Sequence, residues 1–569
     1  MSYSVPEETR KVLVEGILKN PLISNDLPRE IENLKDKVIF TGTDEPLIPI
    51  NWRFAESIAS LKAFEALMLS ALTSRKYGHQ PSKITINTNH ASLFIMSSVI
   101  TQILDKDGAP RPFSPFHAES GKLFPSTDIH NSVNMYRQLS SNIYKAKDGK
   151  YFHTHGDLNP DFTLKGLGLP LKGNEGEDFD TAVSRFRAAV SKFTSDELDE
   201  LMNVQLRQAG TVVLSPEEYF ASEHGKVNAT KGLFEIKRDP GSAQPASWWP
   251  ENESKPSSPK RPLAGLKVVD LTRIIAAPTM SRGLAELGAS VMRVTTSTEP
   301  DLSAVHQDLN WGKWNCDLDL RKVEDKERLV ALIKEADVVL DGYRPGVMER
   351  LGFSRQAVFD MVKDRAYGII HLRENCYGWQ GPWAERSGWQ QISDACCGVS
   401  WQYGKAMGHD EPVTPVFPNS DYCTGVAGTT AVLQALLKRA EEGGSYGVDT
   451  ALNYYSQWLV CSVGTYPEDV WSKVYSRHGS PVFRNYDNMP RLLPSMLKLL
   501  HTHDASELFK PSFFRAQKSH ILDTTFVVVR PIAQYEPAVT ELGFDIGTRG
   551  NGTDAPLWPK DLNVEVVST

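Results

Sequence analysis

The second half of the sequence predicts an α/β fold built on a doubly wound parallel sheet, because strand and helix patterns alternate along it. Residues 266–271 read as a buried strand. Residues 278–287 read as a helix, with Pro278 in its first turn and Gly288 at its end. Residues 290–294 read as a second strand. This βαβ unit is the first observation behind the prediction.

The second observation is that the alternation continues. A helix pattern over residues 326–336 precedes the strand pattern DVVLDGY at 337–343. A helix around residues 347–351 is followed by a further strand over 367–372. Sheets of this kind bind ligands beyond the carboxyl ends of their strands, so we expect a site at that edge.

The turn after the first strand argues against two classes of nucleotide. It reads RIIAAPT and lacks the glycines of a GxGxxG fingerprint, which let the backbone approach a pyrophosphate closely. A nicotinamide or flavin dinucleotide is therefore disfavoured. The sequence also has no GxxxxGK[ST] loop, so triphosphate chemistry loses its main support.

Chain length, composition and net charge limit the class of protein. A chain of 569 residues can bury more than one core, so two or three domains are expected. With 40% hydrophobic residues, 23% charged residues and a net charge of −8, nothing predicts binding to nucleic acid or to a membrane. The first residues lack the apolar core of a signal peptide, and the final Val567-Ser568-Thr569 is no peroxisomal signal. We expect a cytoplasmic protein.

Cysteine and histidine spacing predicts neither a disulfide framework nor a metal site. All six cysteines lie in the second half, and none forms a CxxC pair matched by a second pair. His153 and His155 alternate along a predicted strand, but no third ligand accompanies them at a suitable spacing. We therefore expect free thiols and no bound metal.

The stretch PNSDYCTGVAGTTAVLQALLKRA, residues 418–440, predicts a helix with Asp421 in its first turn. Free N–H groups and the dipole at a helix N-terminus favour a charged carboxylate, so we expect Asp421 to stay ionised near neutral pH and to be a possible nucleophile. The alternative is that Ser420 or Asp421 only caps the helix. Cys423 is a weaker candidate nucleophile because no histidine stands near it in the sequence.

The first half repeats part of the second. Residues 54–74 predict a helix followed by a strand, ITINTN, in the same order as residues 426–440 and the strand pattern YGVDTAL. Matching Ala71, Leu72 and Arg75 to their counterparts in the second helix gives one consistent shift. That shift sets Ser57 opposite Asp421, with Glu56 one residue away, so the first copy is expected to have lost the nucleophile.

Taken together, the motifs resemble those of the family III CoA-transferases, a group that also contains 2-methylacyl-CoA racemases. The matching series is PLAGLKVVDLTRIIAAP, LAELGASVMRV, DLDLR (317–321), ADVVLDGYRPGVMERLGF (336–353), YGWQGPW (377–383) and SDYCTGVAGTTAVLQALL (420–437). In the first half, KDGKYF and KGLGL look like later segments of the family. The resemblance implies a Rossmann-like large domain joined to smaller α+β domains, and subunits that interlock as dimers.

From this we expect four parts: a degenerate half over residues 1–238, a surface linker over 239–261, a Rossmann-like CoA-binding domain over 262–410 and a second, shortened small-domain unit over 411–569. The chain carries the first βαβ unit of the Rossmann-like domain once, so we expect one composite active site per chain, with residues from both halves. A homodimer remains possible.

The resemblance identifies Asp421 with the carboxylate that attacks an acyl-CoA thioester in the transferases. It implies an anhydride and then an aspartyl-CoA thioester, from which an acceptor carboxylic acid collects CoA. Coenzyme A is then a substrate, and no tightly bound cofactor is expected. Nearby N–H groups would stabilise the oxyanion, and Gly425 would leave room for a close approach.

CoA recognition needs cations for its phosphates and apolar walls for adenine and the pantetheine arm. The candidates by motif position are Ile275, Ala276, Arg321, Tyr343 and Arg350. The basic candidates near strand ends are Arg293, Arg344 and Arg373. Plain alternatives are that Arg350 complements a helix C-terminus and that Tyr343 only packs. Thr295 and Thr296 replace the acidic residue and arginine that the family tends to have, which removes the usual contact to the 3′-phosphate.

The racemase branch pairs its aspartate with a histidine. Here the histidine motif aligns with SGWQQIS (387–393) and has Trp389 in that position, so two-base racemisation is disfavoured. The glycine-rich loop common in the transferases is also missing. A CoA-transferase is therefore the preferred function, and the alternatives are an isomerase and a catalytically silent CoA-binding protein.

Overall fold

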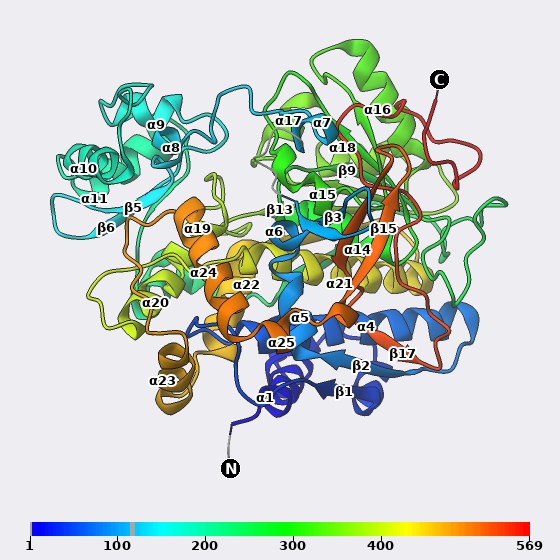
Figure 1. Cartoon of the computed structure of the whole chain (residues 1–569). Helices are drawn as coiled ribbons and strands as arrows, with labels where there is room; N and C mark the ends of the chain where they lie inside the picture. Colours follow the sequence, from blue (N-terminus) through cyan, green and yellow to red (C-terminus); the bar gives the residue numbers. More distant parts are fainter. Residues whose placement is uncertain (1–2, 114–119, 569) are drawn as a thin grey trace.

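The computed structural model describes residues 3–113 and 120–568, and a seven-stranded sheet stands at its centre (Figure 1). In spatial order its strands are β11 (Lys313–Asp317), β10 (Ser290–Thr295), β9 (Lys267–Leu271), β12 (Val338–Asp341), β13 (Ile370–Asn375), β14 (Tyr446–Ala451) and β8 (Phe234–Arg238). The six strands from the second half run parallel, and β8 pairs antiparallel with β14. Counted along the chain their order is 3-2-1-4-5-6, as in doubly wound α/β folds. The predicted fold class is confirmed.

The strands read as apolar runs because both faces of the sheet are buried. Val268 and Val269 are neighbours on β9, yet they belong to separate hydrophobic cores on opposite faces. One face is covered by α14 (Ala276–Glu286) and α21 (Asn419–Glu442), and the other by α16 (Val323–Glu335) and α18 (Arg355–Met361). The carboxyl edge of the sheet is left for a site.

A second, smaller sheet has a similar order of elements. Its strands are β1 (Val38–Thr41), β2 (Lys83–Asn87) and β17 (Gln534–Glu536), with β1 and β2 parallel and β17 antiparallel. The helix α4 (Phe54–Tyr77) joins β1 to β2, and α21 is the last helix before β14. Both helices have 24 residues and lie side by side (Figure 1). Each sheet takes its antiparallel edge strand from the other half of the chain.

The backbone gives a register for the two helices that differs from the predicted one. The Phe54 N–H bonds to the Trp52 carbonyl at 2.8 Å, and the Asn419 N–H bonds to the Phe417 carbonyl at 2.8 Å. The two helices end before Gly78 and Gly443, which are separated by the same number of residues as Phe54 and Asn419. With these turns matched, Asp421 falls opposite Glu56, one residue from the predicted counterpart Ser57. Similar alanine, leucine and arginine spacings recur within any amphipathic helix, whereas the turn before the helix occurs once.

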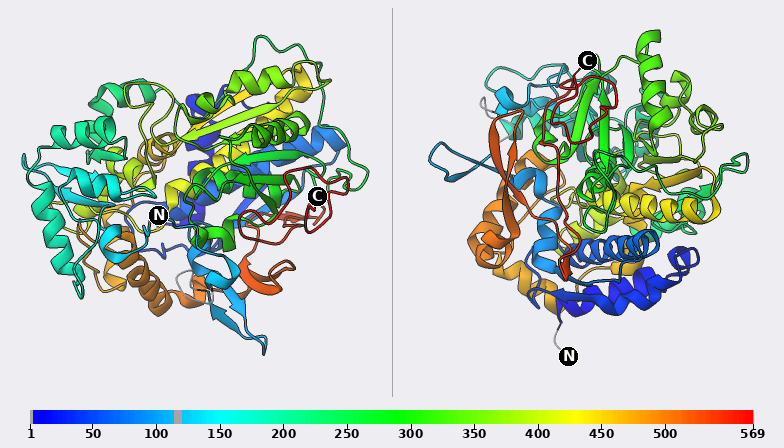
Figure 2. Two further views of the ribbon diagram at one scale, coloured as in Figure 1. Left: turned by 90° about the horizontal axis from the view of Figure 1, so that it is seen from above. Right: turned by 90° about the vertical axis from the view of Figure 1, so that its right-hand side faces the viewer.

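A separate α+β lobe lies in the first half, drawn in cyan in Figure 1 and seen from two further directions in Figure 2. Its sheet pairs β5 (Asn142–Lys145), β6 (Tyr151–Thr154) and β7 (Gly210–Val212). Its helices include α8 (Met135–Gln138), α9 (Asp161–Gly166), α10 (Phe179–Val190) and α11 (Ser195–Asp199). Tyr144, Phe152 and Phe186 belong to a core of its own. We call residues 135–213 the small lobe.

A four-stranded sheet joins the two ends of the chain. It consists of β15 (Phe514–Ser519), β16 (Thr524–Val529), β3 (Gln102–Leu104) and β4 (Pro110–Pro112). The predicted linker, residues 239–261, has no helix or strand. It is nevertheless anchored, because the buried Trp249 donates its indole N–H to the Ala264 carbonyl at 2.9 Å. The four predicted domain boundaries stay a prediction. None of the helices within the described residues combines the length and the hydropathy needed to cross a bilayer.

Candidate active site

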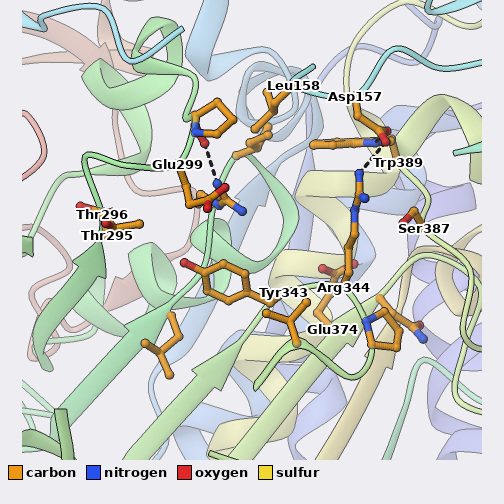
Figure 3. A pocket seen from close by; sticks show the side chains of 18 of the residues that line it. Asp157, Leu158, Thr295, Thr296, Glu299, Tyr343, Arg344, Glu374, Ser387 and Trp389 are labelled. Atoms are coloured by element: carbon orange, nitrogen blue, oxygen red, sulfur yellow. Dashed lines mark hydrogen bonds and ion pairs between the residues drawn. The ribbon is translucent and has the colours of Figure 1, made fainter. Parts of the chain in front are cut away.

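A cavity of about 630 Å³ opens at the carboxyl edge of the main sheet (Figure 3). Its walls come from the ends of β9, β10, β12 and β13 and from the first turn of α21. The first half of the chain contributes His130, residues 157–159, Phe162 and Gln208. The cavity has the size and position expected of a ligand site in a doubly wound sheet. Both halves of the chain form it.

Seven of the site residues proposed from the sequence line this one cavity. They are Asp421, Ile275, Ala276, Arg321, Tyr343, Arg344 and Arg350. Three other candidates, Arg293, Arg373 and Gly425, are absent from its lining. These predicted residues are up to 146 positions apart in the sequence, between Ile275 and Asp421, so the sheet is what brings them together.

The two missing arginines are held by acidic partners. Arg293 is buried and contacts the Asp301 carboxylate at 2.7 Å and the Asn551 amide oxygen at 2.6 Å. Arg373 contacts the Asp449 carboxylate at 3.0 Å. Both were chosen for their charge near strand ends, and the structure uses that charge in internal ion pairs. It gives no support to a CoA contact by either residue.

Gly425 serves helix packing. A Cβ atom at this position would lie 2.4 Å from the Thr279 Cγ2 atom of α14. The missing side chain therefore allows α21 and α14 to approach closely, and the room expected for a ligand is occupied by α14. Gly428 has the same role opposite Met280.

Asp421 is the third residue of α21 and is partly accessible from the cavity. The helix begins after Pro418 without a side-chain cap, so the capping alternative is not realised. Burial raises the pKa of Asp421 well above its usual range, and the neighbouring Glu374 and Asp394 raise it further. Burial, the largest cause, and the two neighbouring acids thus oppose the effect of the helix N-terminus, and the pKa shifts in the direction opposite to the predicted one.

Glu374 and Asp394 complete this acidic cluster. Glu374 lies near the end of β13 and lines the same cavity as Asp421. Burial raises its pKa to about 8, with a further contribution from Asp341. Burial also raises the pKa of Asp394 to about 7, although Asp394 accepts a hydrogen bond from the Gln390 amide. Within the described residues, no ion pair neutralises Glu374, Asp394 or Asp421.

A second cluster joins the small lobe to the main sheet across the cavity. Asp157, in the turn after β6, accepts hydrogen bonds from the Trp389 indole N–H and from the Arg344 guanidinium, the latter at 2.5 Å. Burial alone would raise the pKa of Asp157, but the hydrogen bond with His155 and the charge of Arg344 outweigh it and hold the pKa low. Figure 3 shows Arg344 extending toward Asp157 and Trp389, with Glu374 near its base. We call Asp157, Arg344 and Trp389 the clamp.

Cations also line the outer part of the cavity. Arg273 lies over the Tyr343 ring at 5.0 Å, and Arg321 is paired with Asp319 at 2.8 Å. Arg350 is exposed on α17 (Val347–Leu351). Thr295 and Thr296 lie in the same lining. These groups suit an anionic ligand that enters from the edge of the sheet.

Sequence reasoning missed Glu374 and Asp157 as site residues. Glu374 stands two residues beyond the strand predicted to end at Leu372, and a polar residue at the end of a parallel strand is the available signal. Asp157 lies in the other half of the chain, and only the fold brings it to the cavity. Trp389, expected to replace a catalytic histidine, instead positions Asp157.

Comparison with known proteins identifies the family. Residues 263–483 match CoA-transferase family III. The acetyl-coenzyme A transferase nodX of Hypoxylon pulicicidum is 55% identical over 565 residues, covering 99% of this chain and 95% of that protein. An acyl-CoA transferase of Gibberella moniliformis is 31% identical, covering 94% of this chain and 92% of that protein. A crystal structure of a CaiB/BaiF family protein from Brucella suis is 26% identical, covers 36% of this chain and 56% of that chain, and has a TM-score of 0.31. The chain belongs to CoA-transferase family III.

Proposed function

We propose that this CoA-transferase moves CoA from an acyl-CoA to a carboxylic acid, with Asp421 as the nucleophile. The observation that carries the proposal is that Asp421 lines the same cavity as six of the eight residues expected to contact CoA. The acetyl-coenzyme A transferase named above makes acetyl-CoA the first donor to test.

The chemistry needs one carboxylate and no other residue that forms a covalent bond to the substrate. A carboxylate oxygen of Asp421 attacks the thioester carbon, the C–S bond breaks, and CoA leaves as a thiolate. The thiolate then attacks the Asp421 carbonyl of the anhydride, which frees the first acid and leaves an aspartyl-CoA thioester. The acceptor carboxylate repeats these two steps in reverse, so that a new acyl-CoA leaves and Asp421 is restored.

The cation positions support an orientation for CoA. Arg273, Arg321 and Arg350 would bind its phosphates at the outer edge of the sheet, because phosphate oxygens accept charge-assisted hydrogen bonds. Tyr343 and Leu351 offer apolar surface for adenine or the pantetheine arm. The thiol end would then point toward Asp421 and Glu374.

We also propose that the two halves act as an internal pair of subunits. The support is the reciprocal exchange of edge strands β8 and β17 and the matched helices α4 and α21. The Glu56 carboxylate, which corresponds to Asp421, is fully buried and accepts hydrogen bonds from the Tyr3 and Tyr466 hydroxyls. One working site per chain follows, and a homodimer is not needed to complete it.

One observation favours retaining the isomerase as a second candidate. Trp389 cannot exchange a proton at neutral pH, but Glu374 is a second acidic group beside Asp421. An isomerase would exchange the α-proton of an acyl-CoA with deuterium oxide in the absence of any acceptor acid. A transferase that uses Asp421 only as a nucleophile would not.

The deciding experiment is incubation with acetyl-CoA and an isotope-labelled acceptor acid. We expect labelled acyl-CoA as product, and borohydride or hydroxylamine should trap an adduct on the peptide that contains Asp421. Asp421→Asn should abolish both. Asp410→Asn is the matched control, because Asp410 is exposed and lies outside the cavity lining. Full transfer by Asp421→Asn would refute the mechanism.

A further inference from the structure

The mechanism leaves one cavity group without a role. Glu374 comes from the end of β13 and Asp421 from the start of α21, and both carboxyls are accessible from the same cavity. The arginine next to Glu374 in the sequence, Arg373, is bound to Asp449, as is Arg355. Arg344 is bound to Asp157 on the far side of the cavity. The cations close by are therefore already occupied.

The other groups around Glu374 cannot neutralise it either. Asp341 faces it from β12, Asp421 faces it from α21, and Asp394 on α19 (Gln390–Cys396) lies close to Asp421. Cys376 lies close to Glu374, Asp421 and Asp394, and burial raises the pKa of its thiol, so that it stays uncharged. Two neighbouring carboxyls without a counter-cation do not both ionise at neutral pH.

We propose that Glu374 holds a proton while Asp421 carries the negative charge, and that the Glu374 O–H donates a hydrogen bond to the thioester oxygen when Asp421 attacks. This inference rests on the proposed function. It makes Glu374 a second catalytic residue, which stabilises the oxyanion of the tetrahedral intermediate. An ionised Glu374 would instead repel both that oxyanion and Asp421.

The step balances without any further reactant. The Asp421 oxygen forms a bond to the thioester carbon, and the carbonyl electron pair moves to the oxygen that accepts the hydrogen bond. When the C–O⁻ group collapses, the C–S bond breaks and its electron pair leaves on the CoA sulfur. The proton remains on Glu374 throughout, so it is available again for the oxyanion of each later step.

The inference predicts a particular pH dependence. Burial raises the pKa of Glu374 to about 8, so Glu374 loses its proton as the pH rises through that value. We expect transfer by the natural protein to decline on this alkaline side. Transfer should also decline as the pH falls, because the raised pKa of Asp421 means that its carboxylate gains a proton at a higher pH than an ordinary aspartate does.

The test compares kcat and KM between pH 6 and 10 for three variants. Glu374→Gln keeps an N–H donor that does not titrate, so it should retain activity to within roughly ten-fold and lose the alkaline decline. It should leave the acidic decline nearly unchanged, because Glu374 is already uncharged over the pH range in which Asp421 gains its proton. Glu374→Ala should lower kcat by roughly 10²- to 10³-fold with little change in KM, the usual effect of removing an oxyanion donor. Glu385→Gln, an exposed change in the adjoining loop, should behave as the natural protein does.

Three outcomes separate the possibilities. Loss of the alkaline decline in Glu374→Gln supports the inference. Persistence of that decline, or an inactive but folded Glu374→Gln protein, overturns it, and this variant decides the matter even where Glu374→Ala fails to fold. Full transfer by Asp421→Ala would instead refute the proposed function, whatever Glu374→Gln does.

Discussion

Replacing Gly425 by alanine tests whether this residue allows close packing against α14 or leaves room for a ligand. The new Cβ atom would lie 2.4 and 2.5 Å from Thr279 Cγ2 and Cβ and 3.1 Å from the Ala276 carbonyl oxygen. Thr279 is β-branched and in a helix, so it cannot rotate away, and the two helices must separate. Overpacking of this kind costs about 1–3 kcal/mol, whereas the gain in helix propensity from glycine to alanine is at most about 1 kcal/mol. The net effect is destabilising.

Gly428→Ala is the matched comparison on the same helix. Its Cβ would lie 2.5 Å from the Met280 sulfur atom, which sits on a flexible side chain. The clash is therefore relieved cheaply, and the propensity gain offsets most of the cost. Because the shift per kcal/mol falls with chain length, to about 1 °C for a chain of 569 residues, Gly425→Ala should lower the Tm by about 1–2 °C and Gly428→Ala by less than about 1 °C.

The assay is thermal unfolding alongside KM for the acyl-CoA donor. Separation of the helices would move Ile275 and Ala276, which line the cavity at the start of α14, so KM should rise in Gly425→Ala. Gly121→Ala, where nothing lies within 4 Å of the added atom, controls for the substitution itself. A Gly425→Ala protein with unchanged Tm and a greatly reduced kcat would refute the packing argument and restore the role beside the reacting oxygen.

Three further predictions address the site. Trapping of the covalent intermediate should give one adduct per chain, at Asp421. Mass spectrometry should find none at Glu56, because Tyr3 and Tyr466 enclose that carboxylate. An adduct at Glu56 would contradict a single working site. Asp157→Asn should weaken the clamp by about 1.5–3 kcal/mol, the value of a hydrogen bond to a charged group. Amide hydrogen exchange should then be faster in the small lobe, and unchanged exchange would show that other contacts hold the lobe. Arg350→Ala should raise KM for acyl-CoA at low salt, with the difference shrinking as ionic strength screens the charge; an equal effect at all salt concentrations would point to packing instead.

The sheet could be predicted from the sequence because its strands are buried on both faces and read as apolar runs. The exception is β11, where Lys313 and Asn315 interrupt the apolar pattern. Both are buried: Lys313 contacts the Asp270 carboxylate at 3.1 Å, and the Asn315 amide oxygen accepts from Arg293 at 3.3 Å. A strand whose polar residues find partners inside the protein has no sequence pattern that reveals it.

Residues of the cavity lining were predictable where a motif fixes both a residue and its position, as for Asp421 and Tyr343. It was not predictable where charge alone guided the choice. Arg293 and Arg373 look available in the sequence, but Asp301 and Asp449 bind them, and no local pattern announces those ion pairs. Asp157 is separated from Arg344 by 187 positions, and its contribution depends on how the small lobe docks.

The paired helices α4 and α21 bear on how such a protein can change over generations. In an assembly of identical subunits, every substitution enters both sites at once, so a change that improves one must be tolerated by the other. Here Glu56 and Asp421 are encoded separately, and a mutation near one leaves the other as it was. The half that carries the buried Glu56 is therefore free to accumulate stabilising changes. The half that carries Asp421 can adapt to a new acid without altering the residues around Glu56.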